Sequence, residues 1–226
     1  MSKTKSENIK LITIDGDGCL FSYDNVGSAF RSSWDALGFA YGLKEKWDER
    51  IEKYYGKPKF DRSWAEEDVA DLRGLKVEDS FKELYPVPYC KGAREFAEAS
   101  RGKLLRGILS TGIDIVVNKA SEELGLDFAY CNILHRDNGT FSGTVSYLVP
   151  TWTKSERIEN ICERYHVNPE EICHIGDNEN DLPVGEKVGM FIALKPKKEE
   201  VRAAGDYVVE DFIEVMKIFN LRDGRK

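Results

Sequence analysis

Two kinds of hydrophobic pattern alternate along this chain, short apolar runs and longer helical stripes. The runs, at residues 9–14, 104–109, 172–175 and 190–194, are mainly apolar and are typical of strands buried on both faces of a parallel sheet. The stretches between them carry apolar residues three or four positions apart, as amphipathic helices do. This alternation predicts an α/β fold with a Rossmann-like, mostly parallel sheet covered by helices on both faces.

After the first run, the helical pattern continues for about sixty residues without another strand-like run. Apolar residues recur there in four groups: Phe30, Trp34, Leu37; Trp47, Ile51, Tyr54; Ala65, Val69, Leu72; and Val77, Phe81, Leu84. This pattern predicts a four-helix bundle inserted into the α/β unit. We therefore expect residues 1–22 and 86–226 to form the core and residues 23–85 to form a helical cap domain.

The second half of the chain contains one clear hairpin signal. Asp137-Asn138-Gly139 lies between the alternating segments 128–135 and 140–148, and such a turn predicts two antiparallel strands. Further helices are expected at 92–102, around Val116, Ala120 and Leu124, at 155–166, and around Phe212, Met216 and Phe219.

Charge and cysteine content narrow the possible environments and partners. The net charge is −7, and the small basic cluster of Lys195, Lys197 and Lys198 resembles a solvated face, so neither nucleic acid nor an anionic membrane is an expected partner. Five scattered cysteines without a C-x-x-C pair favour a reducing cytoplasm over a zinc or redox site. No segment approaches the roughly 18 apolar residues of a membrane span.

Polar residues cluster where three of the expected strands end. These clusters are Asp15-Gly16-Asp17-Gly18, Ser110-Thr111-Gly112 and the segment from Gly176 to Asp181. Each cluster alone could be an ordinary turn. Because ligands of open parallel sheets bind beyond the carboxyl ends of the strands, the coincidence of all three indicates a binding site.

The acids of these clusters predict a metal ion. Asp15 and Asp17 are two residues apart and can point to the same side of an extended strand end, with Asp177 at a neighbouring strand end. Three close carboxylates repel one another unless a cation joins them, and Mg²⁺ suits carboxylates together with phosphate and water oxygens. A calcium-binding EF-hand loop does not fit, because Leu20 and Leu182 occupy its glycine position.

In combination, these motifs resemble the haloacid dehalogenase superfamily of phosphatases, whose motifs are D-x-D-x-T/V, a strand ending in Ser or Thr, a Lys, and G-D-x-x-x-D. The phosphoserine phosphatase branch is the most similar. Four phrases carry that similarity: Ser110-Thr111-Gly112-Ile113-Asp114, Leu124-Gly125-Leu126-Asp127-Phe128, Phe141-Ser142-Gly143-Thr144-Val145 and Asn180-Asp181-Leu182-Pro183. The resemblance covers nearly the whole chain outside the expected cap.

The resemblance implies roles for five charged residues. Asp15 would attack phosphorus, form an aspartyl-phosphate and bind Mg²⁺. Asp17 would transfer protons and offer its backbone carbonyl to the metal. Asp177 would bind the metal, and Asp181 would orient metal-bound water or Lys154. Lys154 would neutralise phosphoryl charge, although its position before a helix also suits a surface lysine.

For the substrate phosphate, the resemblance implies the Ser110 hydroxyl and the backbone N–H groups of Thr111 and Gly112, with Asn180 nearby. Ser110 could instead cap a helix. The three histidines, His135, His166 and His174, are assigned to core or surface positions. Cys19 replaces the usual Thr of the first motif without removing a reacting group.

The expected cap departs from the phosphoserine phosphatase pattern. Asp24 occupies the position of a Glu that receives the substrate amine, and Glu67 occupies the position of an Arg that receives its carboxylate. An acid in place of that guanidinium would repel a carboxylate, so phosphoserine is expected to be a poor substrate. Arg31 or Arg62 could compensate from another direction.

The sequence therefore predicts a Mg²⁺-dependent hydrolase of a small phosphorylated metabolite, similar to phosphoserine phosphatases. Three alternatives remain. The substrate could be a sugar or glycerate phosphate, the phosphoryl group could pass to an acceptor other than water, or the aspartyl-phosphate could serve as a switch without turnover. The acid at position 17 and the expected cap argue against a switch.

Overall fold

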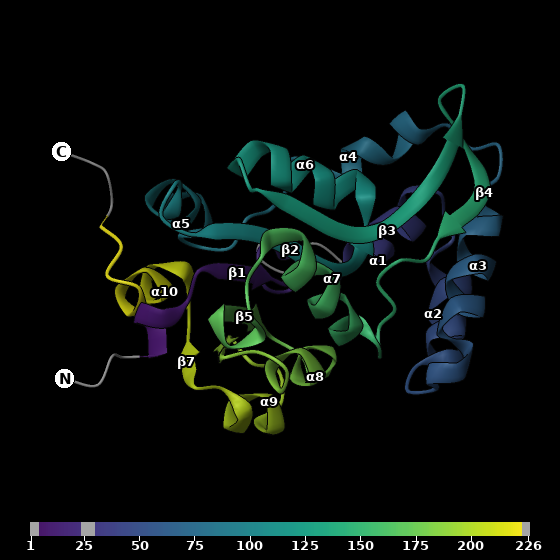
Figure 1. Ribbon diagram of the computed structural model, residues 1–226. Helices are drawn as coiled ribbons and strands as arrows, with labels where there is room; N and C mark the ends of the chain where they lie inside the picture. Colours follow the sequence, from purple (N-terminus) through teal and green to yellow (C-terminus); the bar gives the residue numbers. More distant parts are fainter. Residues whose placement is uncertain (1–4, 24–29, 223–226) are drawn as a thin grey trace.

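The computed structural model describes residues 5–23 and 30–222 and contains a seven-stranded sheet in the order β4-β3-β2-β1-β5-β6-β7 (Figure 1). All neighbouring strands are parallel except β3 and β4. The strands are β1 (Leu11–Ile14), β2 (Leu105–Ile113), β3 (Phe128–Asp137), β4 (Thr140–Ser146), β5 (Ile172–Gly176), β6 (Met190–Leu194) and β7 (Tyr207–Val209). The mostly parallel Rossmann-like sheet predicted from the sequence is confirmed.

Helices cover both faces of the sheet (Figure 1). One face carries α5 (Ala93–Ser100), α6 (Asp114–Leu124) and α10 (Phe212–Ile218), and the other carries α7 (Arg157–Tyr165), α8 (Leu182–Gly185) and α9 (Glu199–Ala204). Alternate residues of β1 enter the two hydrophobic layers, Ile12 and Ile14 on the first face and Leu11 on the second. The central strands are therefore apolar on both sides, which explains their continuous apolar runs.

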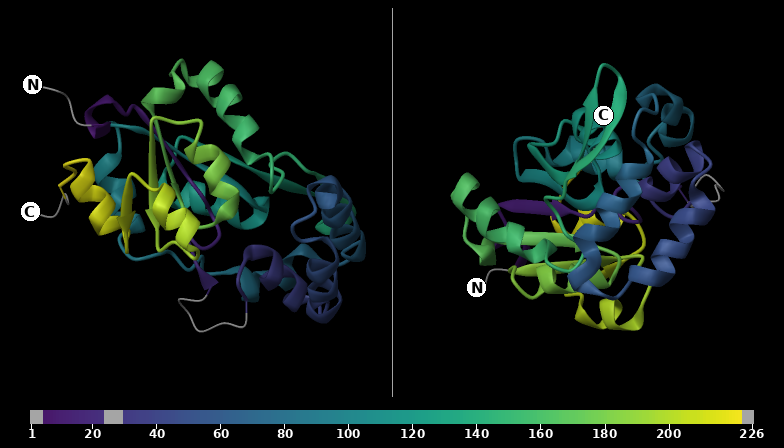
Figure 2. Two further views of the ribbon diagram at one scale, coloured as in Figure 1. Left: turned by 90° about the horizontal axis from the view of Figure 1, so that it is seen from below. Right: turned by 90° about the vertical axis from the view of Figure 1, so that its right-hand side faces the viewer.

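A group of helices lies beyond the carboxyl ends of the strands, at the end of the molecule away from α10 (Figure 2). It contains α1 (Ser33–Ala40), α2 (Lys44–Tyr54), α3 (Asp61–Asp71) and the single-turn α4 (Phe81–Leu84). The fourth helix is not the continuous stripe expected from Val77, Phe81 and Leu84, because residues Val77–Ser80 form a 3₁₀ turn. A 3₁₀ turn has three residues per turn, so Phe81 leaves the apolar face and is 41% exposed.

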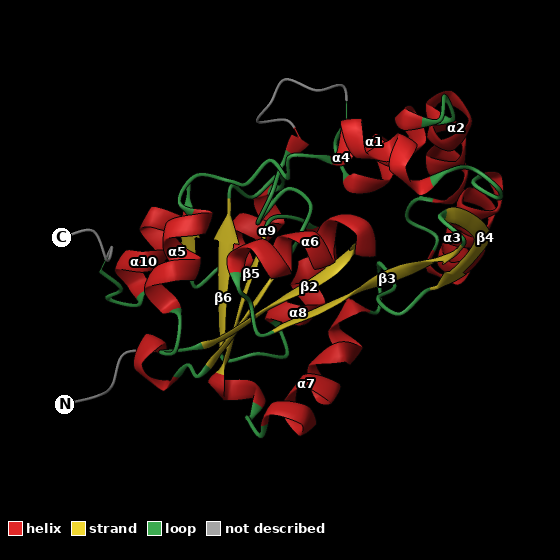
Figure 3. Ribbon diagram, turned by 90° about the horizontal axis from the view of Figure 1, so that it is seen from above, coloured by secondary structure: helices red, strands yellow, loops and turns green. Residues whose placement is uncertain are grey.

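The β3–β4 hairpin extends beyond the ends of the other strands and packs against this helical group (Figure 3). Its turn has positive φ at both Asn138 (47°) and Gly139 (79°), as the two-residue hairpin turn requires. Backbone hydrogen bonds join it to the segment after α3: Gly74 N–H to Phe141 O, Phe141 N–H to Leu75 O, and Val77 N–H to Gly139 O, all at 2.9 Å. The hairpin therefore connects the sheet to the inserted helices.

Several short elements differ from the sequence expectation. β2 continues through Ser110 to Ile113 with an irregular register instead of ending at Ser110, while α8, α9 and β7 have patterns too short to predict. Short 3₁₀ turns occur at Lys5–Asn8, Pro58–Phe60, Val77–Ser80, Lys154–Glu156, Pro169–Glu171 and Glu179–Asp181. Within residues 5–23 and 30–222, no helix is long and apolar enough to span a membrane.

One buried arginine joins β2 to the ends of α5 and α6 and to Asp127. Arg106 on β2 is 2% exposed, and its guanidinium donates to Ala97 O at 2.7 Å and Gly125 O at 3.2 Å. It also pairs with Asp127 at 3.3 Å. These bonds satisfy carbonyls at the ends of α5 and α6, where helices leave such groups unpaired.

We expect Arg106→Met to lower the free energy of unfolding by about 3–5 kcal/mol, because it leaves buried polar partners without a donor. Arg202→Met is the control, since Arg202 is 47% exposed and pairs with Glu199 at 3.7 Å; it should cost less than about 0.5 kcal/mol. Urea unfolding followed by circular dichroism measures both. Equal losses would contradict a structural role for the Arg106 hydrogen bonds.

Candidate active site

The strand ends bring the predicted acids together. Thr13 on β1 pairs with His174 on β5, so the residues that follow these strands, Asp15 and Asp177, emerge side by side. The Asp15 N–H donates to Ile175 O at 2.9 Å, which continues the sheet pairing up to the site. The helices α1 to α3 stand over this edge (Figure 3).

Lys154 is buried between two of the acids. Its Nζ atom lies 2.5 Å from Asp15 Oδ1 and 2.6 Å from Asp181 Oδ1, and the residue is 1% exposed. Burial alone would lower the pKa of Lys154, but attraction to Asp15 and Asp181 outweighs it and raises this pKa above its usual range. Lys154 is therefore a buried cation rather than the surface lysine that its sequence position also allowed.

Asp181 is held by four donors. Oδ1 accepts hydrogen bonds from Lys154 and His174, and Oδ2 accepts from the backbone N–H groups of Asp177 (2.9 Å) and Asn178 (3.2 Å). Burial would raise the pKa of Asp181, but Lys154 and His174 outweigh it and lower this pKa below its usual range. The ionised carboxylate thus fixes the loop that presents Asp177.

His174 is buried in β5, in line with the core position that the sequence allowed, and it also belongs to this network. Its Nε2 lies 2.9 Å from Asp181 Oδ1, and its Nδ1 lies 2.9 Å from Thr13 Oγ1. Burial lowers the pKa of His174, which favours the neutral ring. In a neutral ring that donates from Nε2 to Asp181, Nδ1 would accept from the Thr13 hydroxyl. Its place three residues before Asp177 on an apolar strand concealed this role.

The three buried carboxylates suit a hard divalent cation. Asp15, Asp177 and Asp181 each place an oxygen within 4.8 Å of the others. Asp177 is fully buried, and its Oδ1 accepts no hydrogen bond from the described residues. Burial raises the pKa of Asp177 to about 6 and that of Asp15 to about 7, so a bound cation would stabilise both as carboxylates. Each oxygen of Asp181 accepts two hydrogen bonds, whereas Asp15 and Asp177 each pair with a lysine through one oxygen only, so these two side chains are the better candidates to bind a metal.

The Asp17 side chain lines the same cavity as Asp15 and is bound by the start of α1. Its two carboxylate oxygens accept hydrogen bonds from Ser33, one from the backbone N–H and one from the hydroxyl, both at 2.6 Å. Burial raises the pKa of Asp17 above its usual range, and the Ser33 bonds act in the opposite direction. Asp15 and Asp17 thus line the same cavity, and the N-terminus of α1 binds the Asp17 carboxylate while Lys154 binds that of Asp15.

The serine motif lies beside the acids. Ser110 is 1% exposed and accepts a hydrogen bond from the Gly112 N–H at 3.0 Å. A Cβ atom on Gly16 would come within 2.6 Å of Ser110 Oγ, so glycine permits this close approach. Ser110 does not cap α6, because Ile113 occupies the N-cap position of that helix.

A cavity of about 630 Å³ opens over these groups. Asp15, Asp17, Thr111 and Asn180 line it on the side of the sheet, and side chains of α1, α2 and α3 line it on the opposite side. The Asn180 Oδ1 atom is buried and accepts no hydrogen bond from the described residues, so it can receive a ligand donor.

Two cap predictions have different outcomes. Glu67 does not line the cavity; its carboxylate accepts a hydrogen bond from Tyr54 at 2.6 Å and pairs with Arg50 at 3.5 Å. The next residue, Asp68, lines the cavity instead, because one residue of α3 turns the side chain by about 100°. Asp24 lies outside the described residues.

Two basic residues of the expected cluster pair with acids of the site, although both side chains are 47% exposed. Lys197 Nζ lies 2.7 Å from Asp177 Oδ2, and Lys198 Nζ lies 2.6 Å from Glu179. Both line the cavity, as does Arg31, whereas Arg62 is exposed and pairs with Glu66 at 3.6 Å. Lys197 follows the end of β6, so the rule that identified the other strand ends also applies to it.

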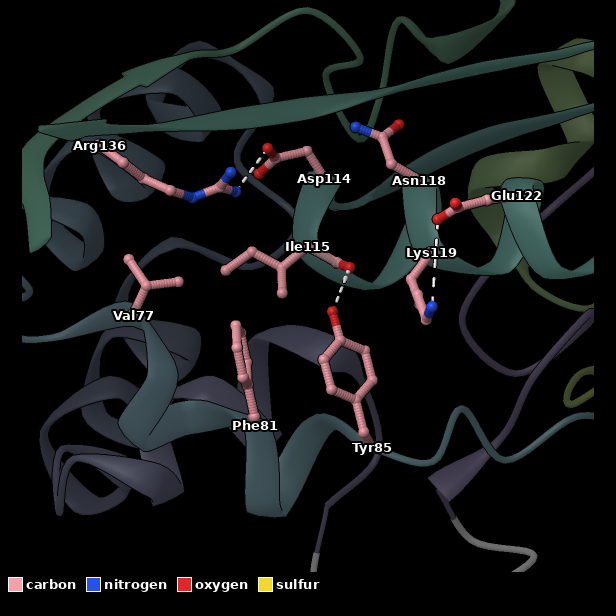
Figure 4. A pocket seen from close by; sticks show the side chains of 9 residues that line it. All are labelled: Val77, Phe81, Tyr85, Asp114, Ile115, Asn118, Lys119, Glu122 and Arg136. Atoms are coloured by element: carbon pink, nitrogen blue, oxygen red, sulfur yellow. Dashed lines mark hydrogen bonds and ion pairs between the residues drawn. The ribbon is translucent and has the colours of Figure 1, made fainter. Parts of the chain in front are cut away.

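A second cavity, of about 280 Å³, lies between α4 and α6 (Figure 4). Its polar groups bind one another: Arg136 pairs with Asp114 at 2.5 Å, and the Tyr85 hydroxyl donates to Ile115 O at 2.8 Å. Neither Asp15 nor Lys154 lines it. The larger cavity is therefore the candidate active site.

Comparison with known proteins gives consistent matches. The family model of haloacid dehalogenase-like hydrolases matches residues 9–189. A phosphoserine phosphatase of Methanocaldococcus jannaschii is 30% identical over 213 residues, which cover 92% of this chain and 96% of that protein. A phosphoserine phosphatase of Lactococcus lactis is 29% identical over 205 residues, covering 88% of this chain and 89% of its own.

Solved structures agree with these relatives. A phosphoserine phosphatase in its apo form superposes with a TM-score of 0.76 at 27% identity, covering 92% of this chain and 98% of its own. A phospho-aspartyl intermediate analogue of phosphoserine phosphatase also gives a TM-score of 0.76, at 26% identity, covering 93% of this chain and 98% of its own. The likeness therefore extends over the core and the inserted helices together.

If Asp15 and Asp177 bind a divalent cation, Mg²⁺ at about 100 times its dissociation constant should stabilise the protein by roughly 2.7 kcal/mol, or about 5–10 °C in Tm. Asp177→Asn should abolish this shift, while Asp48→Asn, which changes a half-exposed carboxylate on α2, should preserve it. Differential scanning calorimetry with and without chelator is the measurement. An unchanged shift in Asp177→Asn would place the metal elsewhere.

Proposed function

The chain belongs to the haloacid dehalogenase-like hydrolases and is a phosphatase, and we propose that it hydrolyses a small phosphorylated metabolite through an aspartyl-phosphate on Asp15. The observation that carries this proposal is the pairing of Asp15 Oδ1 with the buried Lys154 ammonium at 2.5 Å. That contact holds one oxygen of Asp15 and neutralises charge where an anionic phosphoryl group must approach.

In the first half-reaction, a carboxylate oxygen of Asp15 attacks phosphorus, and the bond between phosphorus and the leaving oxygen breaks. Asp17 gives its proton to that leaving oxygen, so an alcohol departs. The hydrogen bonds from Ser33 support this role, because they hold the Asp17 carboxyl in the lining of the cavity that Asp15 also faces.

In the second half-reaction, Asp17 accepts a proton from water, the water oxygen bonds to phosphorus, and the bond from phosphorus to Asp15 breaks. Inorganic phosphate leaves and both acids return to their starting states. A proton-transfer group that lines the same cavity as the nucleophile allows water to hydrolyse the aspartyl-phosphate. This arrangement favours a phosphatase over a phospho-aspartate switch.

The remaining groups of the site support phosphate binding. Ser110 lies against Gly16, the residue after the nucleophile, and Thr111 and Asn180 line the cavity together with Asp15. We place Mg²⁺ on Asp15, Asp177 and the Asp17 carbonyl, where it would offset the phosphoryl charge. Lys154 remains bound to Asp15 and Asp181, so its charge also stabilises the aspartyl-phosphate.

We propose that the two expected domains have different roles in the reaction. Residues 1–22 and 86–226 form the catalytic core, which contacts phosphate and metal. Residues 23–85 form the cap, which contacts the leaving group and therefore decides which phosphomonoester is hydrolysed. The support for this division is that the lining residues on α1, α2 and α3 lie opposite Asp15 across one cavity.

Asp15→Asn should reduce turnover of an aryl phosphate by at least ~10³-fold, because an amide cannot form the acyl-phosphate bond. Loss should be in kcat, since the phosphate contacts remain. Phosphate release under saturating substrate is the measurement, with Asp48→Asn as the matched control. Substantial turnover by Asp15→Asn would require a different nucleophile.

His174→Leu should lower kcat by about 10–100-fold, because Asp181 loses a donor that orients it toward Lys154 and Asp177. His174→Gln, which retains an N–H donor, should recover part of the loss. His135→Gln is the control, since His135 is exposed and bonds to Ser146. If His174→Leu lowers the stability of the fold and His174→Gln recovers none of the lost kcat, His174 contributes through packing alone.

A further inference from the structure

Charge is unevenly distributed across the active-site cavity. The side formed by the sheet carries the buried Lys154 beneath Asp15, and Lys197 and Lys198 at its rim. The opposite side, which we call the cap wall, consists of the lining residues between positions 31 and 68. Three carboxylates stand on the cap wall, Asp35, Asp61 and Asp68. Both acids and lysines therefore stand on the side that receives the phosphate, whereas the leaving group meets mainly the acids of the cap wall.

The acids of the cap wall have few cationic partners. Asp35 accepts a hydrogen bond from the Arg31 backbone N–H at 3.0 Å, and Asp61 accepts one from the Thr151 backbone N–H at 2.7 Å. Backbone donors bind these carboxylates without neutralising their charge. Asp68, which is 5% exposed, is paired with Arg50 at 2.7 Å, but Arg50 also binds Asp71 at 2.7 Å.

Arg31 is the one basic side chain among the described residues of the cap wall, and it is exposed at the edge of the cavity. Together with Arg50, which is paired with Asp68, two guanidinium groups thus face three acids. A substrate carboxylate in this part of the cavity would be repelled by more groups than would attract it.

Aromatic side chains line the cap wall together with these acids. Each of the three long helices contributes one tryptophan, Trp34 from α1, Trp47 from α2 and Trp64 from α3. The rings of Trp34 and Trp47 are 6.3 Å apart and tilted by 57°. Their N–H groups donate to Thr111 O at 3.0 Å and to Asp71 at 3.3 Å, so these rings offer a ligand π surface rather than a donor.

Tryptophan faces beside carboxylates are the surroundings that stabilise organic ammonium groups, because the π quadrupole and the negative charges both attract a desolvated cation. We infer that the leaving group is an amino alcohol that carries an ammonium and no carboxylate, its phosphate lying on Asp15 and its cation on the cap wall. This inference rests on the proposed phosphatase reaction at Asp15. It separates this chain from relatives named for phosphoserine, whose leaving group carries a carboxylate.

The volume of the cavity agrees with this assignment. At about 630 Å³ it lies in the range of pockets that bury whole small molecules, with aromatic walls that suit methyl or methylene groups better than a second anion. A quaternary ammonium and a primary ammonium share this chemistry, and the test below distinguishes them.

The decisive experiment compares kcat/KM for four phosphomonoesters on the Mg²⁺-loaded protein. They are phosphocholine, phosphoethanolamine, phosphoserine, and 3,3-dimethylbutyl phosphate, which has the shape of phosphocholine without its charge. At least one ammonium ester should exceed both the neutral isostere and phosphoserine by roughly tenfold or more. Preference for the methylated ester indicates a quaternary cation, and preference for phosphoethanolamine a primary one.

Variants of the cap wall test the source of this preference. Asp35→Asn should reduce the ratio of kcat/KM for the preferred ammonium ester to that for 3,3-dimethylbutyl phosphate by about three- to tenfold. Trp47→Leu should reduce the same ratio, and it provides an independent variant. Glu66→Gln removes an exposed acid of α3 that does not line the cavity, and it should leave the ratio unchanged.

A binding measurement keeps the inference testable without turnover. Three of the four tryptophans line the cavity, so choline and ethanolamine, the expected products, should change the intrinsic fluorescence in the native protein and less in Trp47→Leu. If phosphoserine or the neutral isostere is preferred while Asp15→Asn is inactive, the inference is wrong and the phosphatase reaction stands. If no phosphomonoester is hydrolysed, the proposed function is wrong, and the fluorescence alone decides whether the cavity binds ammonium.

Discussion

The ion pairs of the buried Lys154 with Asp15 and Asp181 are the interaction on which the site depends. Placing an ammonium at 1% exposure is costly unless anions surround it, and these two carboxylates come from loops after β1 and β5. Asp181 in turn accepts from His174 and from two backbone N–H groups of the loop that carries Asp177. Removing any one partner would leave buried charge uncompensated, so the nucleophile, the lysine and the metal-binding loop are positioned as one unit.

The inserted helices are joined to the core by separate contacts rather than by a connected network like the one around Lys154. Side-chain bonds of Ser33 to Asp17, Trp34 to Thr111, and Asp61 to the Thr151 backbone join the helices to the core around the cavity. Each link is a single residue at the edge of the site, and the hairpin adds backbone bonds at the far side. The chemistry can therefore stay constant while the residues between these links change the leaving group.

Asp17 shows how the two parts combine. Its backbone belongs to the loop after β1, yet its carboxylate is fixed by the first turn of α1. A free N–H at a helix start attracts a carboxylate, so the inserted helix binds Asp17 while Lys154 binds Asp15. Both acids line the cavity, but their different partners suit distinct nucleophilic and proton-transfer roles.

The sequence by itself determined the parallel sheet, its hairpin, and the nearness of Asp15, Ser110 and Asp177, because apolar runs and strand-end residues follow local rules. Tertiary structure alone decided which side chains reach the cavity. One position along α3 exchanges Glu67 for Asp68, and His174 and Lys197 join the site through partners distant in sequence. A helix turns each successive residue by about 100°, so the direction of a side chain depends on how its helix packs, which no local pattern specifies.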